Sequence, residues 1–207
     1  MKRILCQGDS ITDFYRSGES NCHMGYGYVT MLAGKIALAH PGKYEVVNRG
    51  ISGNRVVDLY ARIKKDVINL KPDILTVLIG VNDVWHEIAH QNGVAPEKYE
   101  KILSMFIEEV KEALPDIKII LMEPFVLEGK DTAEHMERFA PMVDKNAQAC
   151  RRVAEKYSLG FVPLQERMDA FAAKTSPEYV LYDGVHPAPA GHAIITEALF
   201  EELNKIL

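Results

Sequence analysis

The sequence predicts an α/β fold: a three-layer α/β/α sandwich built around a five-stranded, mainly parallel sheet. Short apolar runs alternate along the chain with longer segments whose apolar residues recur at helical spacing. The run at residues 74–79 is almost continuously apolar, which is typical of a central parallel strand covered on both faces. Alternation of this kind implies right-handed crossovers, which place helices on both sides of the sheet.

The strands are expected at the short apolar runs. The first run, at residues 4–6, is soon followed by Gly8, which we expect to break the strand because glycine accepts backbone angles that other residues avoid. The five expected strands are, in chain order, residues 4–6, 44–48, 74–79, 117–122 and 159–163.

Six helices are expected between and after these strands. Residues 58–70 carry apolar side chains four positions apart, and Pro41 ends the helical pattern of residues 27–40. Pro96 suits the first turn of a helix, where an N–H has no intrahelical partner. The six expected helices are residues 27–40, 58–70, 96–114, 132–157, 165–174 and 191–207.

Longer connections follow three of the strands, at residues 12–25, 86–95 and 124–131. Loops at the carboxyl ends of parallel strands are where a binding cleft is expected to form. No internal repeat, low-complexity tract or linker interrupts the pattern, so we expect a single domain over residues 1–207. Polar and aromatic residues of the first loop are Tyr15, Arg16, Asn21 and His23.

The composition excludes several classes of protein. A formal net charge of −5 argues against a nucleic-acid-binding protein, and no apolar run reaches the ~18 residues that a membrane span needs. The apolar run near the N-terminus is too short for the core of a signal peptide. Cys6, Cys22 and Cys150 are scattered and odd in number, which fits neither a disulfide framework nor a zinc site. We therefore expect a cytoplasmic protein.

A serine stands where the first strand ends. Gly8-Asp9-Ser10 follows the first expected strand, and Asp9 is expected to bond backbone groups around the turn. At that place a serine hydroxyl is suited to nucleophilic chemistry. Taken alone, Ser10 and Thr12 are explained about as well by helix capping.

Asp183 and His186 offer a base for that serine. An aspartate three residues before a histidine, on a loop that contains Gly184, can bend back to one ring nitrogen and leave the other free as a base. An Asp-Gly surface turn is the alternative. With Ser10 at the end of the first strand, the pair completes a nucleophile, a base and a residue that orients the base.

Three groups are candidate donors to a negatively charged carbonyl oxygen. Gly53 lies in a glycine-containing turn after the second expected strand and offers a backbone N–H, and Asn82 follows the third strand and offers a side-chain amide. Ser10 adds its own backbone N–H. Each has a simpler explanation, turn geometry for Gly53 and a helix cap for Asn82, but their shared position at strand ends favours an oxyanion hole.

These segments resemble the signature blocks of the SGNH (GDSL-like) hydrolases, in the same order and over residues 8–187. The resemblance implies the flavodoxin-like fold of that family and a serine esterase that works through an acyl-serine without metal or organic cofactor. It also implies the site residues. They are the catalytic Ser10, Asp183 and His186, and the oxyanion-hole residues Ser10, Gly53 and Asn82.

A closer resemblance is to intracellular acetyl-xylan esterases of bacteria, over residues 48–54, 71–73, 79–85 and 185–192. It implies removal of acetyl groups from xylo-oligosaccharides and assembly into a homo-oligomer. Tyr182 stands where those esterases have tryptophan, and an aromatic ring there is expected to shape the acyl pocket. Trp85 stacks on a sugar, forms a wall of the acyl pocket or packs in the core.

Other functions remain open at this point. Within the same family the alternatives are a short-chain carboxylesterase, a lysophospholipase or a thioesterase. A non-enzymatic alternative is a carbohydrate-binding protein on a decayed hydrolase fold. His86 and His90 have the spacing of a helical metal pair but lack a third ligand, and His192 is expected to cap or pack. A metal-dependent hydrolase would instead use Asp9, Asp183, His186 and His192 as ligands.

Overall fold

The computed structural model of the chain describes residues 1–16 and 23–207, so that Asn21 and Cys22 lie outside the described residues. Within the described part, five parallel strands form a sheet in the order β2-β1-β3-β4-β5. The expected α/β class and five-stranded parallel sheet are confirmed. The strands are β1 (Lys2–Gly8), β2 (Tyr44–Asn48), β3 (Ile74–Leu78), β4 (Lys118–Met122) and β5 (Gly160–Val162).

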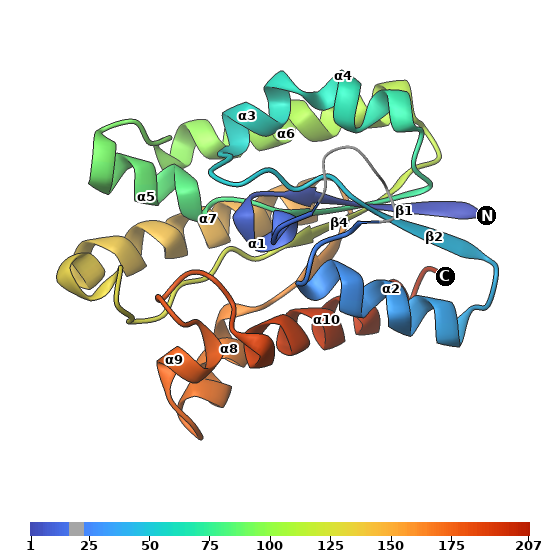
Figure 1. Cartoon of the computed structure of the whole chain (residues 1–207). Coiled ribbons are helices and arrows are strands. Elements are labelled where there is room, and N and C mark those ends of the chain that lie inside the picture. The colour runs from blue at the N-terminus through green and yellow to red at the C-terminus, as the bar shows by residue number, and fades with distance from the viewer. Residues whose placement is uncertain (17–22) are drawn as a thin grey trace.

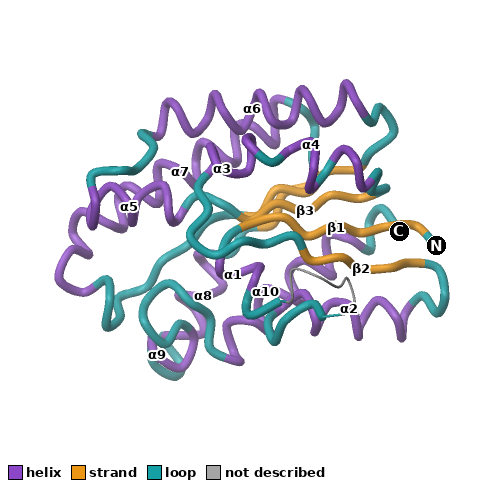
Figure 2. Tube along the Cα trace, turned by 45° about the horizontal axis from the view of Figure 1, so that its top comes forward, coloured by secondary structure: helices purple, strands orange, loops and turns teal. Residues whose placement is uncertain are grey.

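Helices cover both faces of this sheet. In Figure 1, α3, α4 and α6 lie above the strands, whereas α2 and α10 lie below them. Figure 2 shows the strands between the two helical layers, with both chain ends on the side where β1 begins. The longer helices are α2 (Tyr28–Ala39), α5 (Val81–His90), α6 (Pro96–Ala113), α7 (Met136–Lys156), α8 (Gln165–Ala172) and α10 (Pro189–Leu203). The shorter ones are α1 (Ser10–Asp13), α3 (Val56–Ala61), α4 (Ile63–Asp66), η1 (Ile68–Leu70), η2 (Ala133–His135) and α9 (Pro177–Val180).

Alternation along the strands divides the apolar core into two parts. Ile4 and Cys6 of β1 belong to the cluster that packs against α2 and α10, whereas Leu5 belongs to the cluster that packs against α3 and α6. Successive side chains of a strand point to opposite faces, so a strand with helices on both sides must be apolar at nearly every position. This is why residues 74–79 form an almost unbroken apolar run.

One expected helix and one expected loop differ from the structure. The expected helix at residues 58–70 is three short pieces, α3, α4 and η1, because the backbone leaves helical geometry at Arg62 (φ −108°, ψ 13°) and at Val67 (φ −131°, ψ −68°). Part of the expected loop at residues 86–95 is helical, since α5 begins at Val81 directly after β3 and runs to His90. The short α9 was not predicted; Ser176 caps it by accepting from the backbone N–H of Tyr179.

β1 ends at Gly8, as expected, but not through an unusual backbone angle, because Gly8 is not among the residues with positive φ. Glycine is required at this position because neighbouring atoms leave no space for a side chain. A Cβ at this position would stand 2.3 Å from the Thr12 hydroxyl oxygen and 2.4 Å from the carbonyl oxygen of Leu78. The absence of a side chain lets the turn that carries Ser10 fold tightly against the end of β3.

The strand order determines where a site is expected. In an open sheet of order 2-1-3-4-5 the strand order reverses between β1 and β3, because β2 is added on one side of β1 and the later strands on the other. A crevice opens at this point, beyond the carboxyl ends of β1 and β3. Ser10 follows β1 and Asn82 follows β3, on the two sides of that point. The turn with Gly53 follows β2, which pairs with β1 on its other edge.

Among the described residues, no helix combines the length and the apolar character that crossing a membrane requires. Cys6 and Cys150 are buried free thiols, and burial raises the pKa of each to about 12. Neither is therefore a reactive thiolate near neutral pH.

Candidate active site

A chain of two hydrogen bonds joins Ser10, His186 and Asp183. The Ser10 hydroxyl oxygen lies 2.9 Å from Nε2 of His186, and Nδ1 of the same ring lies 2.6 Å from Oδ2 of Asp183. The turn before α1 presents Ser10 at the helix start, where Asp9 acts as the cap and accepts from the backbone N–H of Ile11 at 3.0 Å. The structure thus brings together the three residues that the sequence predicted as nucleophile, base and orienting acid.

The loop that carries Asp183 and His186 is held from within and from outside. Asp183 Oδ1 accepts from the backbone N–H groups of Val185 (2.9 Å) and His186 (2.7 Å). From outside, the backbone N–H of Leu127 donates to the carbonyl of Gly184 and that of Asp131 donates to the carbonyl of Asp183. The connection after β4 therefore anchors the loop, and the carboxylate keeps one oxygen for the imidazole.

Electrostatics match this geometry. Burial by itself would raise the pKa of Asp183, but hydrogen bonds from the His186 ring and from two backbone N–H groups outweigh burial and hold that pKa below its usual value. The hydrogen bond to Asp183 raises the pKa of His186, against the opposing effect of burial. An imidazole that is stabilised as a cation is a stronger base toward the Ser10 hydroxyl.

The predicted oxyanion donors occupy the ends of three adjacent strands. Gly53 has φ +79°, a left-handed conformation that favours glycine, and no atom approaches within 4 Å of where its Cβ would stand. Asn82 is 5% exposed, and its Nδ2 donates to the carbonyl of Asn54 at 3.1 Å. That bond uses one of the two amide hydrogens and leaves the other for a ligand.

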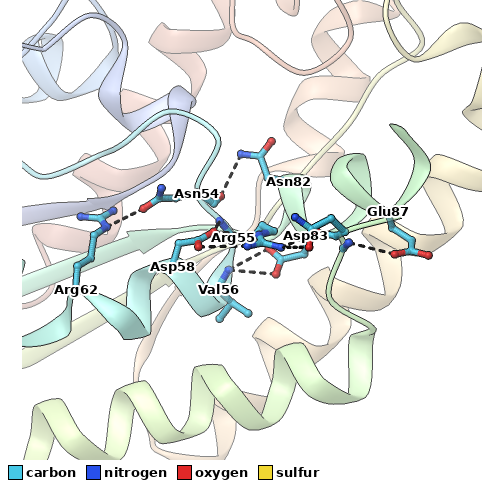
Figure 3. A network of polar contacts seen from close by, with 10 residues as sticks. Asn54, Arg55, Val56, Asp58, Arg62, Asn82, Asp83 and Glu87 are labelled. Atoms are coloured by element: carbon cyan, nitrogen blue, oxygen red, sulfur yellow. Dashed lines mark hydrogen bonds and ion pairs between the residues drawn. The ribbon is translucent and has the colours of Figure 1, made fainter. Parts of the chain in front are cut away.

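A second layer of contacts supports these donors, as Figure 3 shows. The buried carboxylate of Asp83, next to Asn82, accepts from the backbone N–H of Val56 at 3.1 and 3.3 Å and ties the start of α5 to the start of α3. Burial raises the pKa of Asp83 to about 7. Burial likewise raises the pKa of Asp9 to about 7.

A cleft of about 360 Å³ opens beside Ser10 and His186. Tyr182 lines it, is 48% exposed and stacks on the His186 ring with 6.2 Å between ring centroids. The ring centroid of Trp85 lies 5.8 Å from that of the same imidazole, and Trp85 packs edge-on against buried Phe139; it is not among the described residues that line this cleft. The other lining residues in the described part of the chain are Asp13, Phe14, Tyr15, Arg16 and Ser52.

Asp13 and Ser52 of this cleft were not predicted. Asp13 Oδ2 accepts from both the backbone N–H and the hydroxyl of Ser52, at 3.0 and 2.8 Å. The guanidinium of Arg16 donates to the carbonyl of Gly50. Their positions in the sequence could have indicated a place near the site, since Asp13 follows Ser10 by three residues and Ser52 directly precedes Gly53.

The remaining candidates have structural partners. His192 accepts from the backbone N–H of Tyr28 at 3.1 Å and packs on Phe14, and burial lowers its pKa to about 4. The rings of His86 and His90 lie 6.1 Å apart. In the described ranges 1–16 and 23–207, no three or more His, Cys, Asp or Glu side chains form a group able to hold a metal ion.

Known proteins resemble this chain in sequence and in fold. The model of the GDSL-like Lipase/Acylhydrolase family matches residues 6–194. An acetylxylan esterase of Geobacillus stearothermophilus is 36% identical, over 98% of this chain and 94% of that protein. The crystal structure of Axe2, an acetylxylan esterase from the same organism, superimposes with a TM-score of 0.88 at 33% identity, covering 98% of this chain and 94% of that one.

Two further relatives are informative. A Parabacteroides merdae protein described as GDSL-like superimposes with a TM-score of 0.94 at 35% identity, covering 98% of this chain and 95% of that one. An uncharacterized lipoprotein of Bacillus subtilis (strain 168) is 23% identical, over 94% of this chain and 90% of that protein. Solved variants of Axe2 that are described as catalytic mutants replace a serine, an aspartate and a histidine by alanine.

Proposed function

The chain belongs to the GDSL-like lipase/acylhydrolase family and is a carboxylic ester hydrolase, and from this premise we propose that Ser10, His186 and Asp183 hydrolyse acetyl esters of xylo-oligosaccharides or related sugars. The observation that carries the proposal is the continuous hydrogen-bonded chain from the Ser10 hydroxyl to the Asp183 carboxylate. An ordinary serine is a weak nucleophile, and it needs a base within hydrogen-bonding reach to attack a carbonyl.

In the first half of the reaction the Ser10 oxygen bonds to the ester carbonyl carbon while Nε2 of His186 takes the hydroxyl proton. Asp183 stabilises the imidazolium that forms. The carbonyl oxygen becomes an oxyanion and accepts from the backbone N–H groups of Ser10 and Gly53 and from the Asn82 amide. The carbon–oxygen bond to the alcohol then breaks, and the alcohol leaves with the proton from His186.

In the second half, water attacks the acetyl group on Ser10. His186 takes a proton from the water, and the same donors hold the oxyanion again. The bond between the acetyl carbon and the Ser10 oxygen breaks, that oxygen regains the proton from His186, and acetic acid leaves and ionises to acetate in solution. No step needs a metal or an organic cofactor.

The lining of the cleft supports a sugar as the alcohol. Asp13, Arg16 and Ser52 offer hydrogen-bonding groups beside the nucleophile, and the rings of Tyr15 and Tyr182 stand at the same cleft with exposed faces. Hydroxyl-rich ligands are bound by such polar groups, and aromatic rings supply apolar area with a polar edge. The esterase relatives named for acetylxylan agree with this choice.

The experiment measures acetate released from acetylated xylo-oligosaccharides and from 4-nitrophenyl esters of rising acyl length. Acetyl esters should be hydrolysed fastest, and Ser10→Ala should abolish turnover while the circular dichroism spectrum stays unchanged. A folded Ser10→Ala variant with near-full activity would overturn the nucleophile assignment. Fastest hydrolysis of longer acyl chains or of thioesters would instead favour a general carboxylesterase, lysophospholipase or thioesterase.

We also propose that the protein acts in the cytoplasm as a homo-oligomer, as the resemblance to intracellular acetyl-xylan esterases implies. Sedimentation of the purified protein tests the oligomer, and fractionation of cells tests the location. A monomer at micromolar concentration, or recovery in the membrane fraction, would contradict the respective part of this proposal.

A further inference from the structure

Arg62 lies at the point where the expected helix at residues 58–70 is broken, between α3 and α4. Its side chain is only 12% exposed. The guanidinium donates in four directions, and only one of the four acceptors is a carboxylate, that of Asp66 at 3.2 Å. The other acceptors are Asn54 Oδ1 at 2.7 Å, the Arg49 carbonyl at 2.7 Å and the Gly8 carbonyl at 3.0 Å.

Each neutral acceptor belongs to a segment that carries a proposed oxyanion donor. Gly8 lies two residues before Ser10, whereas Arg49 and Asn54 flank the turn that contains Gly53. Asn54 extends the connection further, because its own carbonyl accepts from the amide of Asn82. Figure 3 shows this path from Arg62 through Asn54 to Asn82. One guanidinium thus connects the ends of β1 and β2 directly and reaches the end of β3 through one residue.

We propose that Arg62 is a positioning residue for the oxyanion site, setting the spacing between the Ser10 N–H, the Gly53 N–H and the Asn82 amide. This inference rests on the proposed function, since it assumes that those three groups receive the oxyanion. Donors aimed in advance at the developing charge stabilise the transition state without reorganising, so an error in their spacing lowers kcat more than it changes substrate affinity.

Arginine suits this task and lysine does not. A guanidinium is planar, remains charged and holds five N–H donors in a rigid fork, whereas an ammonium group is a compact charge on a flexible stem. Lysine at position 62 would keep the charge and the ion pair with Asp66. Its single ammonium group would not reach Asn54, Arg49 and Gly8 at once. The segments that carry the oxyanion donors would then no longer be hydrogen-bonded to one shared side chain.

An ion pair that only stabilises α4 is the alternative role. In that case Arg62→Lys, which keeps the pair with Asp66, would leave catalysis unchanged. The geometry argues against this role because three of the four acceptors lie outside α4, at the carboxyl ends of β1 and β2.

Arg3 provides a matched control at the opposite end of β1. It too is partly buried, at 30% exposure, and it pairs with Glu45 at 2.7 Å and donates to the carbonyl of Leu70. Arg3→Lys therefore removes a comparable set of hydrogen bonds at the amino end of β1, whereas Ser10, Gly53 and Asn82 all follow the carboxyl ends of strands. Its effect on kcat measures what a merely structural arginine contributes.

The test compares kcat and KM for acetyl-4-nitrophenol hydrolysis, with urea unfolding recorded for each variant. Arg62→Lys should lower kcat by about 10- to 100-fold with KM within about threefold, since a small misplacement near the reacting atoms costs on this order. Arg3→Lys should keep kcat within about twofold. A folded Arg62→Lys variant whose kcat matches that of Arg3→Lys would overturn the inference.

A double mutant shows whether Arg62 acts through the donors. In the Asn82→Ala background, Arg62→Lys should cost a smaller factor in kcat than it costs in the wild type, because one of the positioned groups is already gone. Equal factors in both backgrounds would contradict the inference. Should Arg62→Lys fail to fold, Asn54→Ala removes the central acceptor alone, and it must lower kcat without raising KM for the inference to stand.

These outcomes are separable from failure of the proposed function. If the wild type does not hydrolyse esters, or if Ser10→Ala stays active, the proposed function is wrong and the comparison of arginines does not arise. If the wild type is active, Ser10→Ala is inactive and Arg62→Lys keeps its kcat, only the inference about Arg62 is wrong.

Discussion

The two sides of the nucleophile are built differently. On the acid–base side, Asp183 and His186 stand three residues apart in one loop, and their contact needs little more than that loop. On the oxyanion side, Ser10, Gly53 and Asn82 come from three segments that follow three different strands. The difference teaches that the base is assembled locally, whereas the oxyanion hole exists only once the parallel sheet has formed.

Their supports differ as well. Backbone bonds from the connection after β4, donated by Leu127 and Asp131, hold the acid–base loop. The oxyanion side is held by side chains, namely the buried carboxylate of Asp83 and the guanidinium of Arg62. A single substitution can therefore remove a hydrogen bond that holds the oxyanion side, whereas the backbone hydrogen bonds that hold the acid–base loop remain after a side chain is replaced.

The largest effect is expected on the acid–base side. Asp183→Asn should lower kcat by about 10³- to 10⁴-fold, because the amide no longer stabilises the imidazolium and favours the wrong tautomer of His186. Steady-state kinetics on acetyl-4-nitrophenol measures this loss. A variant within tenfold of the wild type would mean that the local pair is not the acid–base machinery.

A somewhat smaller effect on kcat is expected on the oxyanion side. Asn82→Ala should lower kcat by about 10²- to 10³-fold and leave KM nearly unchanged, because the amide is needed only when the oxyanion forms. The same assay gives both constants. If KM rises while kcat is kept, Asn82 binds substrate and the oxyanion side consists of backbone donors alone.

The pH dependence isolates the acid–base side. His186 must be neutral to take the Ser10 proton, so kcat/KM should fall as pH drops through the pKa of His186, which the hydrogen bond to Asp183 raises above the usual 6.5. In Asp183→Asn the residual activity should fall at a lower pH, because the carboxylate that raises this pKa is gone. Profiles of kcat/KM between pH 5 and 9, recorded for the wild type and for Asp183→Asn, measure the two decreases in activity. If the decrease lies at the same pH in both proteins, a group other than His186 causes it, and Asp9, with its pKa raised to about 7, is the first to examine.

The smallest effect concerns stability on the oxyanion side. Burial raises the pKa of Asp83 from 3.8 to about 7, so between these pH values the folded state binds a proton that the unfolded state does not. The free energy of unfolding should therefore rise as pH falls from 8 to 5. Asp83→Asn keeps an acceptor for the Val56 N–H and should flatten that rise by on the order of 2 kcal/mol. Urea titrations at several pH values measure it, and an unchanged slope would show that Asp83 does not titrate in this range.

Much of the fold could be predicted because strand periodicity is local. Residues 44–48 match β2 at both ends, and the other four strands differ from expectation by one or two residues at an end. The break at Arg62 could not be read from residues 58–70, since the apolar spacing there continues through it. The bonds from Arg62 to Gly8 and Asn54 are contacts between distant segments, and no helical period encodes them.

The start of α5 was missed for a different reason. Val81, Val84 and Ile88 do carry helical spacing, but only Ile79 and Gly80 separate this helix from the end of β3. Gly80 makes the sharp transition at φ +131°. Because no longer connection marks the boundary, the segment looks like the end of a strand followed by a loop.

By itself, the sequence determined the alternation that builds a parallel sheet and the residue types that carry the chemistry, because both are written in short spacings along the chain. Only the tertiary structure decided that Asp13 and Ser52 share the cleft with Tyr182, that Trp85 lies outside it, and that Arg62 joins three segments. These arrangements depend on which strand ends become neighbours, and the order β2-β1-β3-β4-β5 arises from packing the whole chain.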